Sequence, residues 1–441
     1  MQATRGDSNE QSKSKLRKMK GSPSELDSGE KTMKETNDKD KAEQSKPVGH
    51  SRRDFIVSAA TAVASVGGAN LLNLQPVQGA NAENSVAIGN DPYPTEGMAA
   101  YAPTGPHKLM KFQRRALGPK DVAIKIHYCG VCHSDIHTIR GDWGKIQYPQ
   151  IVGHELAGEV VAVGSSVSKF TVGARVGVGT MVNSCRICTE CQAGHENYCL
   201  NGNTQTYGSK DKDGTITQGG YSTFVVVDED FVINIPDAID LAEAGPLLCA
   251  AITVYSPLRR WGVSPGKKVA IVGMGGLGHL AVKLATALGA EVTVFTTSPD
   301  KIEDAKRFGA KAAVINEDGA DFSKLKHTFD FALDTVPYKH DLNPFIPLLK
   351  RDVTYCRVGV GKVVDSNEIG QMNLVLYRNA LAGSNTGGIQ ETQDMVDFCA
   401  LNKIKPEITK ISMNGIDDAW KKVFDKQARY RFVIDMASLK A

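Results

Sequence analysis

The pattern of hydrophobic and polar residues divides the chain into a polar beginning and a long remainder with regular apolar runs. Residues 1–50 are rich in Lys, Glu, Asp, Ser and Gln and contain almost no aliphatic side chains. Such a segment cannot bury enough apolar surface to offset the entropy lost on ordering, so we expect it to be disordered. A weakly apolar run follows from about Phe55 to Leu74. It is short and rich in Ala, Ser and Gly, which is poor for a permanent membrane span.

The clearest element pattern is a strand followed by a glycine-rich turn and a helix. The apolar run 268–272 predicts a buried strand, and residues 279–285 have helical spacing. Between them the glycines match G-x-G-x-x-G in the context that this fingerprint requires. Without side chains, the turn lets the backbone approach a pyrophosphate at the positive helix N-terminus. The residues that we assign to this cofactor turn are Gly273, Gly275, Gly276, Leu277 and Gly278.

The end of the next predicted strand indicates which cofactor binds. Strand 291–295 runs into hydroxyl groups and a nearby cation, namely Thr296, Thr297, Ser298 and Lys301. An NAD site usually has an acidic residue here for the ribose 2′-hydroxyl, whereas hydroxyls and a cation suit a 2′-phosphate. We therefore predict NADP(H). Asp300 would repel the phosphate if it turned inward; alternatively it is a solvated acid at a helix start.

Length and composition set broad limits. A chain of 441 residues suggests about two or three domains. The hydrophobic share of 41% and the charged share of 23% are typical of a soluble globular protein. The net charge of +3 gives no reason to propose a nucleic-acid partner.

The segment before the globular part has the features of an export signal. Arg52-Arg53 precede the apolar run, and Ala80-Asn81-Ala82 has the spacing of a signal-peptidase site. Residues 51–82 thus resemble a twin-arginine signal peptide, whose machinery exports folded, cofactor-loaded proteins. We expect a periplasmic or otherwise exported protein that begins near Glu83 and has no stable membrane span in its mature chain. If the arginine pair is only a solvated basic pair, the protein is cytoplasmic.

Four cysteines within fifteen residues predict a structural zinc site. Gaps of two, two and seven residues separate the cluster Cys185, Cys188, Cys191 and Cys199. Such gaps let four thiolates close a tetrahedron around one zinc ion and leave no open position for a substrate. The alternatives are two disulfides, which an exported protein could form, or an iron–sulfur cluster.

A second zinc site, with an open position, needs three protein ligands from separate elements. The candidates are Cys132 in Cys-Gly-Val-Cys-His-Ser-Asp, His154 and Glu155 in Gly-His-Glu, and Cys249 in Pro-Leu-Leu-Cys. Each has an ordinary alternative when taken singly. Cys249 could be a small core hydrophobe, Cys129 and Cys132 a redox pair, and His154 a hydrogen-bonded core histidine.

Taken together, these motifs resemble those of the zinc-containing medium-chain dehydrogenase/reductases. The closest subgroup is the cinnamyl alcohol dehydrogenase family, which includes bacterial NADP-dependent alcohol dehydrogenases and aldehyde reductases. The resemblance runs from about Pro94 to the C-terminus. It implies that Cys132, His154 and Cys249 hold the catalytic zinc and that Glu155 can serve as an alternative ligand. It also implies that Asp135 orients the His154 imidazole, as ligating histidines generally require.

The resemblance implies hydride transfer between NADP(H) and a small-molecule primary alcohol or aldehyde of broad type, aromatic ones included. Zinc acts in such sites as a Lewis acid on the substrate oxygen. Ser134, two residues after a ligand, is the natural first hydroxyl of a proton relay, which the family continues through the cofactor ribose to His137. The alternative for His137 is an ordinary polar residue on a helix face. Later strand ends supply Val358 and Ser384 to the cofactor site.

Three further residues bear on the substrate. Trp143 either borders the substrate pocket or is a core tryptophan. Ala251 stands where the family pattern has glycine, and Asn385 is more polar than the residue common in enzymes of lignin-type aldehydes. The last difference argues against a narrow cinnamyl specificity.

The implied fold is α/β, with two domains. A GroES-like, β-rich catalytic domain comprises residues 83–248 and 387–441, and a Rossmann domain that binds NADP comprises residues 249–386. Family members are commonly homodimers. The competing enzyme class is an NAD-dependent polyol or threonine-type zinc dehydrogenase, which often uses Glu as the third zinc ligand. A remote alternative is a non-enzymatic periplasmic metal or thiol protein.

Overall fold

The structure, a computed structural model, describes residues 92–317 and 319–439. The polar segment 1–50 and the predicted signal peptide at 51–82 lie outside these residues. All described residues belong to one compact unit, Glu83–Ala441.

The β-rich part is organised around a seven-stranded sheet with the order β16-β17-β3-β4-β5-β9, in which β8 also pairs with β3. Its central strands are largely buried, and β3, β4, β5, β8 and β17 contribute side chains to one hydrophobic core. The strands of this sheet are β3 (Asp121–Gly130), β4 (Leu156–Val163), β5 (Arg175–Val178), β8 (Phe224–Asp228), β9 (Ile233–Asn234), β16 (Ile408–Ser412) and β17 (Arg431–Asp435). Two small two-stranded sheets and three helices accompany it: β1 (Tyr93–Ala100) with β2 (His107–Arg114), β6 (Met181–Asn183) with β7 (Thr204–Gln205), α1 (His133–Arg140), α2 (Thr189–Gln192) and α9 (Ile416–Phe424).

The second sheet is parallel throughout, and its order is β12-β11-β10-β13-β14-β15. Numbered from its first strand, this is the order 3-2-1-4-5-6 of the Rossmann fold. Its strands are β10 (Lys268–Val272), β11 (Glu291–Thr296), β12 (Ala312–Ile315), β13 (Phe331–Asp334), β14 (Thr354–Arg357) and β15 (Ala380–Gly383). The helices of this part are α4 (Ile252–Arg260), α5 (Gly278–Ala287), α6 (Ile302–Arg307), α7 (Gln371–Val375) and α8 (Ile389–Leu401).

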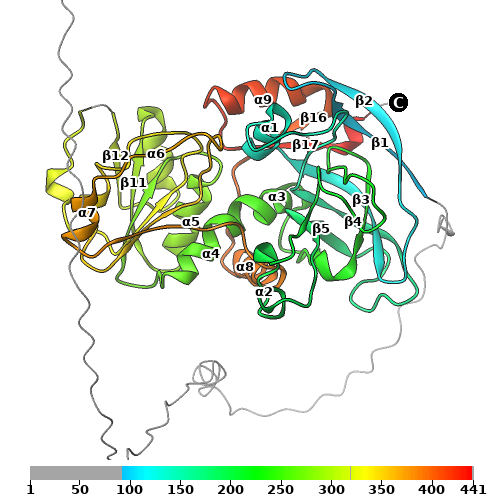
Figure 1. Ribbon diagram of the computed structural model, residues 1–441, viewed down its shortest axis with the longest axis horizontal. Coiled ribbons are helices and arrows are strands. Elements are labelled where there is room, and N and C mark those ends of the chain that lie inside the picture. Colours follow the sequence, from blue (N-terminus) through cyan, green and yellow to red (C-terminus); the bar gives the residue numbers. More distant parts are fainter. Residues whose placement is uncertain (1–91, 318, 440–441) are drawn as a thin grey trace, which may run out of the picture. The chain divides into compact units, whose positions relative to one another are not determined.

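One continuous helix joins the two parts. It consists of α3 (Leu241–Pro246), a π-helical turn (Leu247–Ala251) and α4. Figure 1 shows α3 and α4 between the two sheets. By length and composition the helix 241–260 could cross a membrane, but 83% of its apolar window is buried inside the molecule, as in a core helix. The predicted boundary between residues 248 and 249 falls inside this helix, not in a linker.

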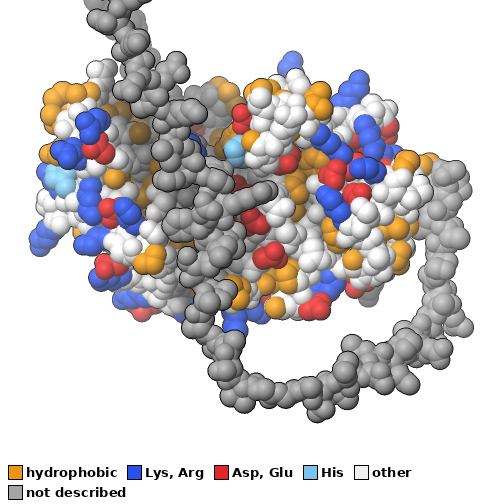
Figure 2. Space-filling view, turned by 90° about the horizontal axis from the view of Figure 1, so that it is seen from below, with side chains coloured by type: hydrophobic (Ala, Val, Ile, Leu, Met, Phe, Trp, Pro, Cys, Tyr) orange, Lys and Arg blue, Asp and Glu red, His pale blue; other side chains and the backbone are white. Residues whose placement is uncertain are grey.

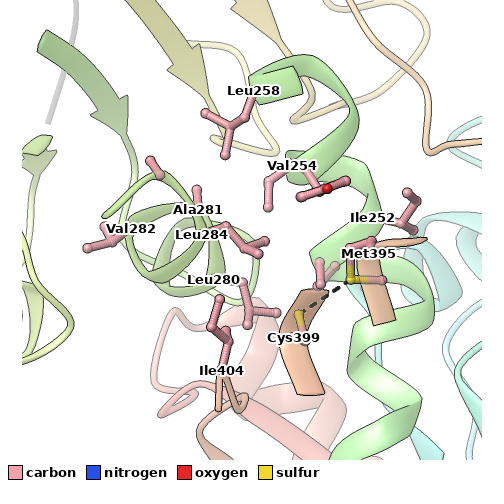
Figure 3. Close-up of a cluster of buried hydrophobic side chains, with 14 of the residues drawn as sticks. Ile252, Val254, Leu258, Leu280, Ala281, Val282, Leu284, Met395, Cys399 and Ile404 are labelled. Carbon is pink, nitrogen blue, oxygen red and sulfur yellow. Dashed lines mark hydrogen bonds between the residues drawn. The ribbon is translucent and has the colours of Figure 1, made fainter. Parts of the chain in front are cut away.

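A buried hydrophobic cluster holds the joining helix against its neighbours. Figure 3 shows that α4, α5 and α8 contribute side chains that point toward one another. Leu258, Leu280 and Met395, one from each helix, have no measurable exposure. Cys399 lies in the same cluster, where its thiol contacts Met395 Sδ at 3.6 Å, so this cysteine is a core residue. The cluster fixes where the π-helical turn, and therefore Cys249, lies relative to the nucleotide-binding sheet.

Candidate active site

Cys132, His154, Glu155 and Cys249 form one buried group whose ligand atoms all lie within 4.8 Å of one another. The Sγ atoms of Cys132 and Cys249 are 3.8 Å apart, and His154 Nε2 is 3.1 Å from Cys249 Sγ. Tetrahedral zinc with Zn–S near 2.3 Å separates two thiolates by about 3.8 Å. The donor types and the sulfur separation therefore fit a zinc ion held by Cys132, His154 and Cys249.

Each of these ligands is positioned by a different local feature. Cys132 follows β3 as the N-cap of α1, and His154 lies just before β4. Antiparallel pairing of β3 and β4 brings Cys129 opposite Leu156, so both ligands lie at the same end of the sheet. Cys249 lies in the π-helical turn, a distortion that is frequent at functional sites.

Asp135 lies beside the His154 imidazole, the ring that we expected it to orient. Its Oδ1 atom lies 3.1 Å from His154 Nδ1, which leaves Nε2 to face the thiolates. The other carboxylate oxygen accepts hydrogen bonds from the Cys132 backbone N–H at 2.9 Å and from the Tyr221 hydroxyl at 2.8 Å. Tyr207 OH also lies 3.1 Å from His154 Nδ1. Asp135 is fully buried, so these donors are what stabilise its charge.

Glu155 belongs to the group but already has a partner. Its carboxylate forms a salt bridge with Arg431, whose Nε lies 3.2 Å from Oε2, and both side chains are buried. Burial raises the pKa of Glu155, and Arg431 opposes this rise. Gly130 leaves room for the carboxylate, because a Cβ there would lie 1.9 Å from Glu155 Oε2. Glu155 is thus close enough to act as an alternative ligand, and it is held by Arg431 in this structure.

The four-cysteine loop also forms a compact group. Cys185, Cys188, Cys191 and Cys199 are mutually within 4.8 Å, and the Sγ atoms of Cys185 and Cys191 are 3.9 Å apart, close to the tetrahedral value of about 3.8 Å. Backbone N–H groups of Ile187 and Cys188 lower the pKa of Cys185 to about 6, which favours the thiolate that binds metal. The nine cysteines all lie in the described part of the chain, and none forms a disulfide. The loop fits a structural zinc site.

A cavity of about 820 Å³ is lined both by Cys132, His154 and Cys249 and by the Rossmann turn. Gly273 has φ of +93°, and a Cβ at Gly278 would lie 2.1 Å from the Gly273 carbonyl oxygen, so both positions require glycine. Gly275 has open space on its Cβ side, where a pyrophosphate can approach. The residues predicted for the cofactor site that line this cavity are Gly273, Gly275, Gly276, Leu277, Thr296, Thr297, Ser298, Lys301, Val358 and Ser384. Gly278 begins α5 behind the turn.

The strand end that is predicted to hold a 2′-phosphate keeps its cation and turns its acid away. Lys301 is only 7% exposed, and burial lowers its pKa. Asp300 forms a salt bridge with Arg429, and its side chain is 66% exposed. Asp300 therefore does not point into the cofactor cavity, which is the unfavourable orientation that the sequence had left open.

The predicted relay residues lie along the same cavity. Ser134 and His137 both line it, on the first two turns of α1. His137 Nδ1 is 2.9 Å from Asp142 Oδ2, so this imidazole has an acidic partner. Trp143 stacks on His137 with 5.1 Å between ring centres, and it lines the cavity instead of lying in a core.

Three residues of the site were not predicted from the sequence. Arg431 contacts Glu155, Tyr207 contacts His154, and Tyr221 contacts Asp135. None of these three residues stands in a recognisable motif. They are between 53 and 276 positions away from their partners along the chain. Only the folded topology brings them to the site.

Comparison with known proteins agrees with this geometry. A family model for the alcohol dehydrogenase GroES-like domain matches residues 118–237, and one for zinc-binding dehydrogenases matches residues 276–400. The chain is 50% identical over 344 residues to NADP-dependent alcohol dehydrogenase C 1 of Mycolicibacterium smegmatis, covering 78% of this chain and 98% of that one. It is 46% identical over 347 residues to the aldehyde reductase YahK of Escherichia coli, covering 78% and 99%.

Solved structures give the same result. A cinnamyl alcohol dehydrogenase from Sorghum bicolor superposes with a TM-score of 0.76 at 38% identity, covering 79% of this chain and 99% of its own. CAD from Helicobacter pylori, solved in complex with NADP(H), superposes with a TM-score of 0.75 at 39% identity, covering 79% of this chain and 99% of its own. With two matched domains, a buried group of zinc-ligand side chains and a Rossmann cofactor turn, the chain belongs to the zinc-binding alcohol dehydrogenases with a GroES-like domain, in the cinnamyl alcohol dehydrogenase family.

Proposed function

We propose that this protein is an NADP(H)-dependent zinc alcohol dehydrogenase that works chiefly as an aldehyde reductase of broad substrate range. The carrying observation is the single cavity that is lined both by Cys132, His154 and Cys249 and by the Rossmann turn. Zinc held by these three ligands would polarise the oxygen of the carbonyl or alcohol, and NADP(H) would supply or accept the hydride.

The protein's own residues then manage position and protons. The turn at Gly273–Gly278 and the strand end of β11 orient the cofactor along the cavity. Ser134, two residues after the ligand Cys132, would exchange a proton with the substrate oxygen. His137, whose Nδ1 pairs with Asp142, would pass that proton outward, and both residues line the cavity. Trp143 gives the cavity an aromatic wall, and Asn385 gives it a polar one. Such a mixed lining supports medium-sized and aromatic aldehydes in preference to one narrow substrate.

A substrate and cofactor panel tests this function. We expect purified protein containing two zinc ions per chain to reduce aromatic and medium-chain aldehydes with NADPH, and to do so with a higher kcat/KM than with NADH. Alcohol oxidation with NADP and with NAD is measured on the same preparation. Faster turnover of polyols or threonine with NAD would contradict the proposal, as would the absence of aldehyde reduction at full zinc occupancy.

We also propose that the protein is a homodimer that pairs through β15. Among the described residues β15 pairs only with β14, so its outer edge has free backbone groups. Leu381 of this strand is 42% exposed, and other aliphatic side chains nearby in sequence are more exposed: Val363, Val364, Met372, Val375 and Leu376. Figure 2 shows hydrophobic side chains among charged ones at the left, where α7 lies in Figure 1. An edge strand with apolar neighbours suits pairing with a second copy about a two-fold axis.

A lysine on the edge strand should separate the copies. Because charged residues blunt edge pairing, we expect Leu381→Lys to convert the dimer to a monomer. Light scattering coupled to size-exclusion chromatography measures the mass of each variant. Leu401→Lys is the matched control, since Leu401 is 83% exposed at the end of α8 and away from the sheet edge. A monomeric wild type, or an unchanged mass for Leu381→Lys, would contradict the dimer.

The export of the protein is a separate proposal, because the twin-arginine segment at 51–82 lies outside the described residues. It is supported by the sequence pattern alone. Fractionation of cells should recover a shortened chain beginning near Glu83 outside the cytoplasm, and an intact chain confined to the cytoplasm would exclude export.

A further inference from the structure

The cofactor strand end carries an acid at a place where an acid is unfavourable for NADP(H). Asp300 stands between Ser298 and Lys301, both of which line the cavity. A 2′-phosphate carries about 1.5 to 2 negative charges, so a free carboxylate beside it would weaken binding through Coulomb repulsion. In the structure, however, Asp300 is not one of the described residues that line the cavity.

Arg429 accounts for this orientation. It lies between α9 and β17, in the segment that returns to the catalytic part, and its guanidinium forms a salt bridge with the Asp300 carboxylate. Arg429 Nη1 also lies 4.0 Å from Asp304 Oδ2 on α6. One cation from the catalytic part thus faces two acids of the nucleotide-binding part, next to the cavity.

The side chain of Tyr430, next to Arg429, packs against the nucleotide-binding part. The Tyr430 hydroxyl donates a hydrogen bond to Asp304 Oδ2 at 2.5 Å, and its ring stacks on the buried His279 with 5.0 Å between ring centres. Lys301 Nζ lies 5.7 Å from the centre of the same ring. The residue next to Arg429 is therefore held against the nucleotide-binding part, and Lys301 is the cation of the β11 strand end that lines the cavity.

We propose that Arg429 is a specificity-determining positioning residue, which favours NADP(H) over NAD(H) by neutralising Asp300 and holding its carboxylate away from the 2′-phosphate. This inference rests on the proposed function only in its preference for NADP(H). Arg429 lies about 130 positions after the end of β11, where the ribose 2′-phosphate is expected to bind, and it belongs to the other structural part. Arg429 acts through Asp300 and does not itself line the cavity described above.

Dissociation constants of NADPH and NADH test the inference on zinc-loaded full chain. We expect Arg429→Ala to weaken NADPH binding about five- to tenfold through the exposed carboxylate, with little change for NADH. Arg429→Lys, which keeps the charge, should restore most of the preference. In the double variant Arg429→Ala/Asp300→Asn the loss should disappear, because the repelling group is gone. The effect of Arg429→Ala should also shrink at high salt.

Lys421→Ala is the matched control, since Lys421 also forms an exposed pair, with Asp425 at 2.6 Å, but that pair does not involve the cofactor strand. If Arg429→Ala weakened the binding of NADPH and of NADH equally, the inference would be overturned, because Arg429 would then have a merely structural role. A preference for NADPH that Arg429→Ala leaves unchanged would overturn it too, with the proposed function intact. A wild type that binds NADPH no better than NADH would overturn the proposed cofactor and this inference together.

Discussion

Replacing Cys249 with serine is expected to reduce aldehyde turnover by about three orders of magnitude while the fold is retained. The thiolate lies 3.8 Å from Cys132 Sγ and 3.1 Å from His154 Nε2, so its loss removes one of three protein ligands. A Lewis acid contributes several kcal/mol to stabilising the charge that develops on the substrate oxygen, and each 1.4 kcal/mol, approximately, is a tenfold change in rate. Zinc analysis should fall from two ions to one per chain, because the four-cysteine loop is untouched.

Cys399→Ala is the control for this experiment. Cys399 is also fully buried, but it contacts Met395 in the core and lies outside both cysteine groups. We expect Cys399→Ala to keep two zinc ions and near-normal turnover despite a loss of stability. If Cys249→Ser retained full zinc content and turnover, Cys249 would be the core hydrophobe of the alternative interpretation and not a ligand.

The second large effect is expected on stability, from removal of the cation opposite Glu155. Arg431 is 5% exposed and Glu155 is fully buried. Arg431→Met leaves a buried carboxylate without its partner, which costs about 3–5 kcal/mol in comparable cases. Urea unfolding followed by circular dichroism, at one fixed zinc concentration, measures the free energy of unfolding.

A double variant distinguishes the destabilisation caused by an unpaired buried charge from the net contribution of the salt bridge to the free energy of unfolding. Arg431→Met/Glu155→Gln should recover much of the lost free energy, since a neutral amide has a smaller desolvation penalty than a carboxylate. Lys311→Met removes a cation from an exposed pair with Glu291 and should cost at most about 1 kcal/mol. An Arg431→Met variant as stable as Lys311→Met would show that Glu155 does not depend on this partner.

The parts of the site that could be predicted are those whose chemistry is local in sequence. The Rossmann turn was predictable because strand, glycines and helix are consecutive, so the fingerprint contains its own context. The four-cysteine loop was predictable because all its donors lie within fifteen residues. For the three catalytic ligands, spacing alone left ordinary alternatives open, and the resemblance to a family was needed to choose among them.

The parts that could not be predicted depend on distant pairing. Nothing near Arg431 indicates that it faces Glu155, 276 positions earlier; β17 brings it there by pairing with β3. The orientation of Asp300 could not be derived either, because its partner Arg429 comes from a loop of the other part. The domain boundary at 248/249 came from the family resemblance, and the sequence did not reveal that a helix continues through that point.

That uninterrupted helix decides how chimeras of this enzyme with its relatives should be assembled. A crossover within residues 241–260 would take Cys249 from one parent and the side chains that pack around it from another. The exposed turn after α4, where Gly262 and Gly266 have φ of +68° and +85° and a Cβ would meet nothing within 4 Å, is the better crossover point. A crossover there exchanges the Rossmann strands as a block and keeps Cys132, His154 and Cys249 in one parental segment, so the helix contacts that must be matched between the parents include those of α4 with α5 and α8.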